Sequence, residues 1–531
     1  MSFIISQLSY IHPDREPLFE QISFAVQSGQ KIALVGNNGV GKSLLLKIIA
    51  GKLEQSAGDV VINSKLYYVP QHFGQYDEMS VAEALGIAHK VAALNAITEG
   101  DASVENFAIL DDDWGVEERA LAALSEWGME YVKLDRQLNT LSGGEKTKVF
   151  LSGIRIHEPS IVLLDEPSNH LDIKRREQLY EFIRTTRMTL LVVSHDRNLL
   201  NLLEETYELS RKGVSVYGGN YDFYKEQKES ELNALQEGVD EKEKELRKAR
   251  KVAREVAERL QREDARGKGK ALRERAPRIA MNTLRNKAEQ SSSRMKDVHA
   301  GKMEAISDEL KQIRAELPDM KELKMNFEYG NLHKGKLLVK AEAINFTYDS
   351  EYLWKETLHF EIKSGDRLAI KGKNGSGKTT LLRLISGESK PTEGVLTRLD
   401  FTSICVDQEY SLINNHLTVY EQLQSFNKRN FQDHELKMML TRFLFSSESW
   451  DKPCGKLSGG EKMRLVFCCM MVNNNAPDMF ILDEPTNNLD IRTLEIVASV
   501  IREYKGTVVL ISHDQYFLNE IGIEEEINLS F

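Results

Sequence analysis

Two glycine-rich segments of this 531-residue chain end in a lysine followed by a hydroxyl residue. They read GNNGVGKS at Gly36–Ser43 and GKNGSGKT at Gly372–Thr379. Glycines let backbone N–H groups turn toward an anion, the lysine can reach the β- and γ-phosphates of a nucleotide, and the hydroxyl can bind Mg²⁺. The pattern therefore predicts two phosphate-binding loops. The residues predicted to bind ATP in them are Gly36, Asn37, Asn38, Gly39, Val40, Gly41, Lys42 and Ser43, and Gly372, Lys373, Asn374, Gly375, Ser376, Gly377, Lys378 and Thr379.

An apolar run that ends in two adjacent acids follows each glycine-rich segment. The first acids, Asp165 and Asp483, are predicted to hold Mg²⁺ through water. The second acids, Glu166 and Glu484, can orient and deprotonate the water that attacks the γ-phosphate, so we predict that they are catalytic. A solvated acidic pair is the alternative, but both copies continue as Pro-[Ser/Thr]-Asn-x-Leu-Asp, which disfavours it.

A histidine and a glutamine also recur in both halves of the chain. His195 and His513 each end a further apolar run and are predicted to contact the γ-phosphate and the attacking water, with a purely structural histidine as the alternative. Gln71 and Gln408 lie 29 and 30 residues after the loop lysines and are predicted to sense Mg²⁺ and water rather than to be surface residues. The predicted metal-binding residues are Ser43, Gln71 and Asp165, and Thr379, Gln408 and Asp483.

The elements that must hold these motifs are present twice. A segment LSGGE occurs at Leu141–Glu145 and again at Leu457–Glu461, between the glycine loop and the acidic pair. The offset between the copies falls from 336 residues at the glycine loop to 318 at the histidine motif. The first copy therefore carries about 20 more residues between its glycine loop and its LSGGE segment.

Short apolar runs predict an α/β fold for each copy. Lys31–Val35 is predicted to be a short strand that runs into a glycine turn, and Leu44–Ala50 has helical spacing. Ile161–Leu164 and Leu190–Val193 are typical of parallel strands buried on both faces. We therefore predict two phosphate-loop domains joined by a linker. The predicted boundaries are 1–225 for the first domain, 226–334 for the linker and 335–531 for the second domain.

The linker resembles neither domain. Apolar residues recur every three to four positions over Leu232–Leu260 and again over Met281–Leu317. This spacing predicts two amphipathic or coiled-coil helices that form an antiparallel hairpin, with a first arm of about 35 residues reaching roughly 50 Å. Helicity is predicted to break between the arms at Gly267, Gly269 and Pro277.

Charge is distributed unequally along the chain. The net charge is −11, which argues against general nucleic-acid binding, yet residues 241–300 hold 19 Lys and Arg against 10 Asp and Glu. Basic residues near a hairpin tip suit a phosphate backbone, although a solvated helix face is the alternative. The predicted RNA-binding residues are Arg262, Arg266, Lys268, Lys270, Arg273, Arg275, Arg278, Arg285 and Lys287.

Cysteine usage and hydropathy indicate a cytoplasmic protein. The four cysteines form no CxxC pair and are expected to be reduced thiols rather than metal ligands. No apolar run approaches the roughly 20 residues of a membrane-spanning helix. The start, MSFIISQLSY, lacks the pattern of a secretory signal.

Together these motifs resemble the ATP-binding cassette superfamily, for which LSGGE is the signature. The resemblance implies that two cassettes face each other head to tail within one chain, as a monomer, and that each phosphate loop meets the other cassette's signature. One ATP would then lie against Ser458, Gly459 and Gly460, and the other against Ser142, Gly143 and Gly144. The family also stacks adenine on an aromatic residue, a role that falls to Tyr348 in the second copy and to His12 or Tyr10 in the first.

Two cassettes around a charged helical hairpin resemble the ABC-F proteins, ATPases of translation. This implies closure on two ATP with Mg²⁺, binding to the ribosomal exit site, and contact of the hairpin with ribosomal RNA and P-site tRNA. The role would be that of a translation factor or of antibiotic resistance by ribosome protection, which the sequence does not distinguish. Extra length near Ala88–Asp113 allows only a short arm, and no basic C-terminal extension is expected.

Three other functions are consistent with cassette motifs. A transporter's ATPase subunit would lack a long basic hairpin, and a DNA-maintenance ATPase would carry zinc modules or longer coiled coils. A non-hydrolysing structural clamp would not need the glutamates and histidines that both copies retain. We therefore predict hydrolysis of ATP to ADP and phosphate at both sites.

Overall fold

The computed structural model describes residues 2–12, 17–101, 103–169, 171–210, 213–273, 297–298, 300–314, 333–348, 351–373, 375–473, 477–486, 489–512 and 514–529. They fall into two compact units. One unit contains Met1–Tyr224 and Leu323–Phe531, and the other contains Lys225–Glu322.

The first α/β domain is built on a six-stranded sheet in which five strands are parallel. The two strands that lead to the acidic pair and to His195 are buried along their whole length, because their sequences, IVLLD and TLLVV, are apolar on both faces. In sheet order the strands are β5 (Leu66–Val69), β6 (Ile161–Asp165), β7 (Thr189–Val193), β3 (Lys31–Val35), β8 (Glu205–Ser210) and β9 (Gly213–Tyr217).

A second, antiparallel sheet lies on one side of the helix that follows the glycine loop. This sheet has the order β2 (Pro17–Val26), β1 (Phe3–Ile11) and β4 (Ala57–Ile62), and the helix is α1 (Lys42–Ile49). Leu45 of α1 shares one buried cluster with Phe3 of β1 and Ile32 of β3. The helix is thus enclosed between two sheets, which fixes the direction of its N-terminus.

The remaining helices of this domain pack in a separate apolar cluster. They are α2 (Val81–Ala84), α3 (Ala88–Thr98), α4 (Val104–Leu110), α5 (Val116–Glu126), α6 (Gly143–His157), α7 (Ile173–Thr185) and α8 (Arg197–Leu200), with 3₁₀ turns at Gly74–Tyr76 and Leu138–Thr140.

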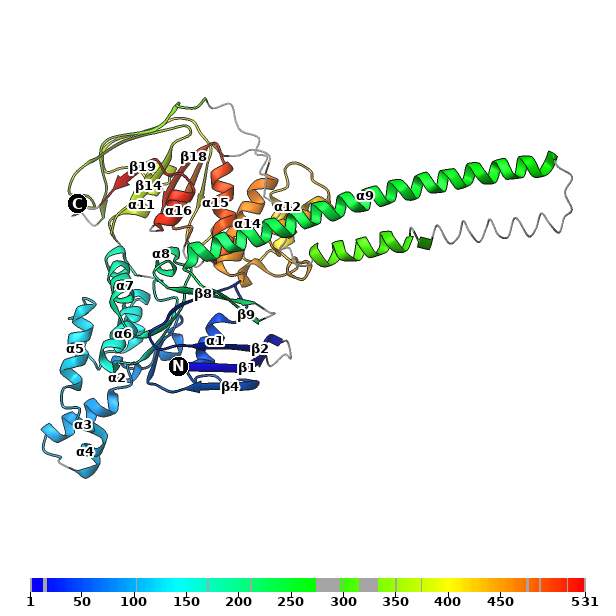
Figure 1. Ribbon diagram of the computed structural model, residues 1–531. Coiled ribbons are helices and arrows are strands. Elements are labelled where there is room, and N and C mark those ends of the chain that lie inside the picture. The colour runs from blue at the N-terminus through cyan, green and yellow to red at the C-terminus, as the bar shows by residue number, and fades with distance from the viewer. Residues whose placement is uncertain are drawn as a thin grey trace. The chain divides into compact units, whose positions relative to one another are not determined.

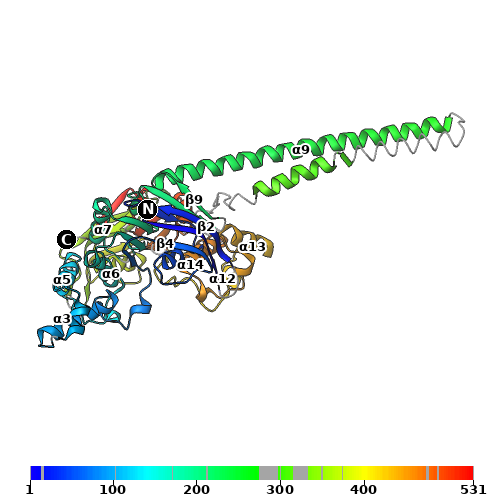
Figure 2. The ribbon, with the colours of Figure 1, turned by 60° about the horizontal axis from the view of Figure 1, so that its bottom comes forward.

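The extra length of the first copy forms a short helical arm. Helices α3 and α4 contact each other and project from the rest of the domain in both views (Figure 1 and Figure 2). Asp113 ties the arm to the next helix by accepting from Lys90 at 3.1 Å and from Arg119 at 2.6 Å.

The second domain repeats this plan with a five-stranded parallel sheet in the order β16 (Ser403–Val406), β17 (Met479–Asp483), β18 (Thr507–Ile511), β14 (Arg367–Lys371) and β19 (Glu525–Asn528). Its other strands are β10 (Leu337–Asn345), β13 (Leu358–Lys363) and β15 (Glu393–Arg398) in one sheet, and β11 (Thr347–Tyr348) and β12 (Glu351–Tyr352) in another. Its helices are α11 (Lys378–Ser386), α12 (Val419–Ser425), α13 (Asp433–Arg442), α14 (Gly459–Val472), α15 (Ile491–Glu503) and α16 (Gln515–Glu520), with 3₁₀ turns at Ser447–Ser449 and Cys454–Lys456. The predicted pair of α/β domains is confirmed.

The unit Lys225–Glu322 contains all but the first four residues of a long helix, α9 (Tyr221–Arg273), and a second helical segment at 300–314. Val239 and Leu246 of α9 pack against Ile306 and Leu310 of that segment. Lys242 interrupts the apolar stripe, and its Nζ instead bonds the Glu309 carboxylate at 2.7 Å. The two arms of the predicted hairpin therefore meet through a small apolar cluster and an ion pair.

Two details of the predicted hairpin are wrong. Helix α9 has 53 residues, roughly 80 Å at 1.5 Å per residue, and it continues through Gly267 and Gly269. A glycine inside a helix costs only about 1 kcal/mol, so two glycines among lysine, alanine and leucine do not end it. Pro277 lies outside the described residues.

The predicted RNA-binding residues lie mostly beyond what the structure shows. Arg262 is exposed on α9, and the backbone of α9 is helical at Arg266, Lys268, Lys270 and Arg273. The other predicted contacts, Arg275, Arg278, Arg285 and Lys287, lie outside the described residues. In the described part of the chain, no helix is both long and apolar enough to cross a membrane.

Candidate functional site

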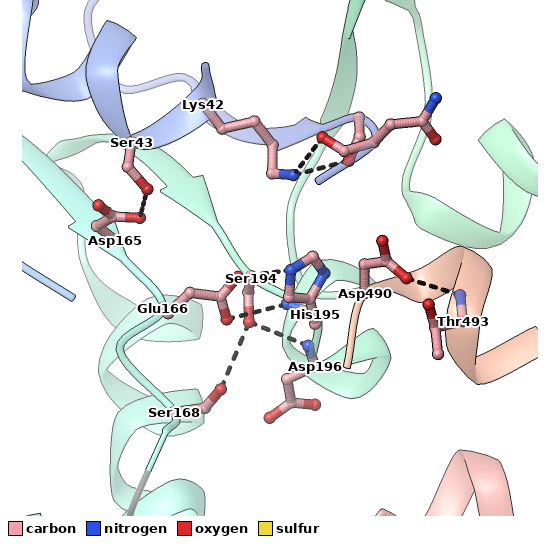
Figure 3. Close-up of polar contacts among 12 residues, drawn as sticks. Lys42, Ser43, Asp165, Glu166, Ser168, Ser194, His195, Asp196, Asp490 and Thr493 are labelled. Carbon is pink, nitrogen blue, oxygen red and sulfur yellow. Dashed lines mark hydrogen bonds and ion pairs between the residues drawn. The ribbon is translucent and has the colours of Figure 1, made fainter. Parts of the chain in front are cut away.

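Both glycine loops fold around their own lysine. The Lys42 ammonium donates to the carbonyls of Gly36 at 2.7 Å and Asn37 at 3.2 Å (Figure 3). Lys378 makes the same pair of bonds, at 2.9 Å to the Gly372 carbonyl and at 3.1 Å to the carbonyl of the next residue. Burial lowers the pKa of both lysines, and the neighbouring carboxylates oppose this shift. Each loop thus presents a buried cation where a phosphate would lie.

The helices after the loops begin without a side-chain cap. Gly41 precedes α1 at φ 100° and Gly377 precedes α11 at φ 87°, conformations that favour glycine. Because no side chain accepts from the first N–H groups of these helices, they remain available to an anion. This is the arrangement expected of a phosphate-binding loop.

A hydroxyl and a carboxylate meet beside each loop. Ser43 Oγ donates to Asp165 Oδ1 at 3.0 Å, and Thr379 Oγ1 donates to Asp483 Oδ2 at 3.0 Å. Both carboxylates are buried, which raises their pKa, and these hydrogen bonds oppose the shift. Hydroxyl and carboxylate oxygens are ligands that suit Mg²⁺, so the residues present fit this ion.

Tyr68 contacts Asp165, although no sequence motif had marked it as a site residue. Its hydroxyl donates to the second oxygen of Asp165, Oδ2, at 3.2 Å. Its position could have indicated this role, because it precedes Gln71 by three residues and lies on the strand next to that of Asp165.

The predicted catalytic glutamates share an unusual backbone. Glu166 has φ 52° and Glu484 has φ 49°, in the left-handed region that non-glycine residues rarely adopt. The Glu166 N–H donates to the Val193 carbonyl at 2.8 Å, and the Glu484 N–H donates to that of Ile511 at 3.0 Å. These bonds hold the backbone of each glutamate against the end of the strand that leads to the histidine motif.

Glu166 and His195 lie in contact with each other (Figure 3). His195 Nε2 lies 3.3 Å from Glu166 Oε1, and the His195 backbone N–H donates to Oε2 at 3.2 Å. Burial, together with the charge of Asp165, raises the pKa of Glu166 to about 8. Burial and the Lys42 charge lower the pKa of His195 to about 3, so its imidazole is neutral near pH 7. At pH 7 a carboxyl with a pKa near 8 is mostly protonated, and only its ionised fraction can accept a proton from water.

Asp490 of the second cassette lies near the Lys42 and His195 side chains of the first cassette. Figure 3 shows it facing His195 and Lys42, while it also caps α15 by accepting from the Thr493 N–H at 2.7 Å. Its charge opposes the burial-induced lowering of the Lys42 and His195 pKa values. A cavity of about 40 Å³ lies beside this contact, lined from the first cassette by Ser168, Arg176, His195 and Asp196 and from the second by Thr486 and Asp514, among others.

The two signature serines begin helices. Ser142 caps α6 and Ser458 caps α14, each in a capping box with the glutamate three residues on. The partners of these glutamates differ, since Glu145 bonds the Tyr131 hydroxyl and Glu461 bonds the Lys452 ammonium at 3.2 Å. The glycines of both signatures lie in the first helical turn, where backbone N–H groups have no helical partner.

The predicted adenine-stacking residues contact other side chains of their own cassettes. Tyr348 is 51% exposed, and its hydroxyl lies 3.1 Å from that of Thr380. The Tyr10 and His12 rings pack edge to face, with centroids 5.6 Å apart. Within the described chain, no hydrogen bond joins either predicted glutamine sensor, Gln71 or Gln408, to an acidic pair. Asn374 and His513 lie outside the described residues.

Comparison with known proteins shows the family to which the chain belongs. A family model described as ABC transporter matches the chain twice, at residues 19–169 and 356–487. The probable ATP-binding protein YbiT of Escherichia coli O157:H7 is 29% identical over 96% of this chain and 92% of its own. ABC transporter F family member 5 of Arabidopsis thaliana is 28% identical over 95% of this chain and 72% of its own.

The solved structures support the fold. One of them is the archaeal ribosome recycling factor aABCE1, solved with the ribosomal stalk protein aP1. The two structures align over 97% of this chain and 86% of the aABCE1 chain. Its TM-score is 0.59 at 21% sequence identity, which is a likeness of fold alone.

Proposed function

The chain belongs to the ABC transporter family, whose ATP-hydrolysing domain it carries twice, and we propose that it is an ABC-F type ATPase that closes on two ATP and acts at the ribosome. The observation that carries the proposal is the Glu166–His195 pair beside the loop of Lys42, with the second cassette's Asp490 facing it. We place the protein in the cytoplasm on the strength of this ribosomal role.

The proposed chemistry follows from the positions of these groups. Lys42 exchanges its loop carbonyls for the β- and γ-phosphates, and the first N–H groups of α1 bind the same anion. Ser43 and Asp165 would hold Mg²⁺, which offsets the charge of the phosphates. Glu166 orients a water molecule and takes its proton, and the neutral His195 holds the Glu166 carboxylate in place.

The second site would use the equivalent residues Lys378, Thr379, Asp483 and Glu484. We propose that each signature supplies its serine and glycines to the other cassette's ATP. Both serine hydroxyls accept from a backbone N–H of their own helix, and that of Ser142 also donates to the Glu145 carboxylate at 2.7 Å. Ser142 would therefore exchange its bond to Glu145 for one to the γ-phosphate while remaining a cap. ATP would then join the cassettes, and hydrolysis would remove the bridging charge and let them separate.

The ribosomal role has separate support. F-family relatives extend over nearly the whole chain, including the hairpin. The hairpin carries the basic stretch that begins at Arg262, which suits a phosphate backbone. We propose that this stretch contacts ribosomal RNA or P-site tRNA near the peptidyl-transferase centre, in a translation factor or in a protein that protects ribosomes from antibiotics.

Ribosome co-sedimentation of the variant Glu166→Gln/Glu484→Gln tests this proposal. ATP without turnover should trap the closed state, so we expect ATP-dependent association with ribosomes. Association with membranes instead would favour a transporter subunit. If the wild-type protein releases no phosphate from ATP, a non-hydrolysing structural clamp would be favoured. Absence of ATP-dependent ribosome binding would refute the ribosomal role while leaving the ATPase intact.

A further inference from the structure

We propose that Tyr68 is a positioning residue for the metal-binding carboxylate of the first cassette, and that Cys405 in its place makes the second cassette's metal site different. The inference deepens the ATPase function proposed above and rests on it. It is based on the hydrogen bond from Tyr68 to Asp165, for which the described residues of the second cassette show no counterpart.

Tyr68 occupies the strand beside that of Asp165. On β5 it is the register partner of Leu163, two residues before Asp165 on β6. Its ring is 5% exposed, and the Lys52 ammonium lies 5.3 Å from the ring centroid. Its hydroxyl donates to Asp165 Oδ2 at 3.2 Å, while Ser43 donates to Oδ1 at 3.0 Å. Both oxygens of this buried carboxylate are therefore held.

Cys405 takes the equivalent position in the second cassette. On β16 it is the register partner of Ile481, two residues before Asp483 on β17. Thr379 donates to one oxygen of Asp483 at 3.0 Å, as Ser43 does in the first cassette. Among the described residues, no side chain replaces Tyr68 at the other oxygen. A thiol is only a weak donor, so it does not substitute for a phenol.

The difference matters because a carboxylate must be aimed to hold a metal. With two donors, one on each oxygen, Asp165 cannot rotate freely about its Cβ–Cγ bond. Each oxygen still has a lone pair for the water molecules around Mg²⁺. Partners of this kind, behind the residues that hold the metal, typically change metal affinity by about 10- to 100-fold.

A purely structural role for Tyr68 makes a different prediction. The hydroxyl would then only satisfy a buried acceptor, and its loss would lower stability without changing metal affinity. The substitution Tyr68→Phe separates the two roles, because it keeps the buried ring and removes only the hydroxyl. Cys405→Ser is the matched control at the equivalent strand position.

The test uses the full chain carrying Glu166→Gln and Glu484→Gln, which holds ATP without turnover. With ATP saturating, Mn²⁺ replaces Mg²⁺ as the probe, since both prefer oxygen ligands. Free Mn²⁺ is followed by electron paramagnetic resonance, and bound ATP is counted separately. We expect two classes of Mn²⁺ site in the parent, and we expect Tyr68→Phe to weaken one of them by roughly tenfold with two ATP still bound.

Each other outcome counts against the inference. Unchanged Mn²⁺ affinities in Tyr68→Phe overturn it, and so does an equal shift in Cys405→Ser. If the parent has a single class of Mn²⁺ site and Tyr68→Phe leaves its Mn²⁺ affinity unchanged, the two metal sites are alike and the inference is wrong. A parent that binds no ATP refutes the proposed function and this inference together, whereas two bound ATP with an unmoved Mn²⁺ affinity refutes this inference alone.

Discussion

Arg197 of the first cassette donates to the carboxylate of Glu520 in the second, with Nη1 2.6 Å from Oε2. The Arg197 side chain is 1% exposed and that of Glu520 is 17% exposed. The guanidinium also lies over the Tyr516 ring, 4.8 Å from its centroid. This buried pair therefore joins the two cassettes only two residues along the chain from His195, a predicted catalytic residue.

Removing one member of this pair should destabilise the protein. Glu520→Gln leaves the buried Arg197 cation without its carboxylate, and we expect a loss of about 2 kcal/mol, or roughly 5 °C in Tm. Calorimetry of the full chain measures this shift.

Two controls accompany this substitution. Glu258→Gln breaks the exposed pair of Arg254 and Glu258 and should change Tm by about 1 °C or less. Replacing both Arg197 and Glu520 with methionine should restore much of the lost stability. Equal Tm values for Glu520→Gln and the wild type would contradict the role of the pair.

The rate of ATP hydrolysis should depend on the ionisation of Glu166. Burial and the charge of Asp165 raise its pKa to about 8, and only the ionised form accepts a proton from water. In the variant Glu484→Gln, where turnover is left to the first site, kcat/KM should rise about tenfold for each pH unit below 8 and level off above it. A flat profile between pH 6 and pH 9 would exclude Glu166 as the base.

The same raised pKa predicts how stability varies with pH. Folded Glu166 keeps its proton up to about pH 8, whereas in the unfolded chain it ionises near 4.5. Folding therefore becomes less favourable as pH rises from 4.5 through 8. Glu166→Gln, which cannot ionise, should gain Tm over the wild type progressively, by roughly 10 °C between pH 5 and pH 8.5. The matched control Glu181→Gln, at a side chain 65% exposed, should show a constant difference across that range.

Adenine binding should depend on Tyr348 and not on its neighbour. Tyr348 and Tyr352 lie on the paired strands β11 and β12 and are 51% and 61% exposed. Stacking of a base on an aromatic ring contributes about 1 to 3 kcal/mol. Tyr348→Ala should therefore weaken ATP binding at the second site by about fivefold or more, measured by titration in the variant Glu166→Gln/Glu484→Gln. Tyr352→Ala should leave it unchanged, and equal effects of the two substitutions would rule out specific stacking.

The phosphate loops, the acidic pairs and the signature helices could be predicted from the sequence because each is a local structure. Glycine spacing determines which backbone conformations a loop can adopt, and runs such as Ile161–Leu164 are apolar enough to be buried strands wherever they pair. The hairpin was predicted from the same periodicity. Its first helix was predicted too short because glycine weakens a helix without ending it.

Only the tertiary structure decided which distant side chains meet. Tyr68 reaches Asp165 because β5 pairs with β6 in one particular register. Arg197 reaches Glu520 across 323 positions of sequence, a contact that no local pattern encodes. Long-range contacts depend on how whole sheets and helices pack, so the sequence determined the reactive groups and the packing determined their partners.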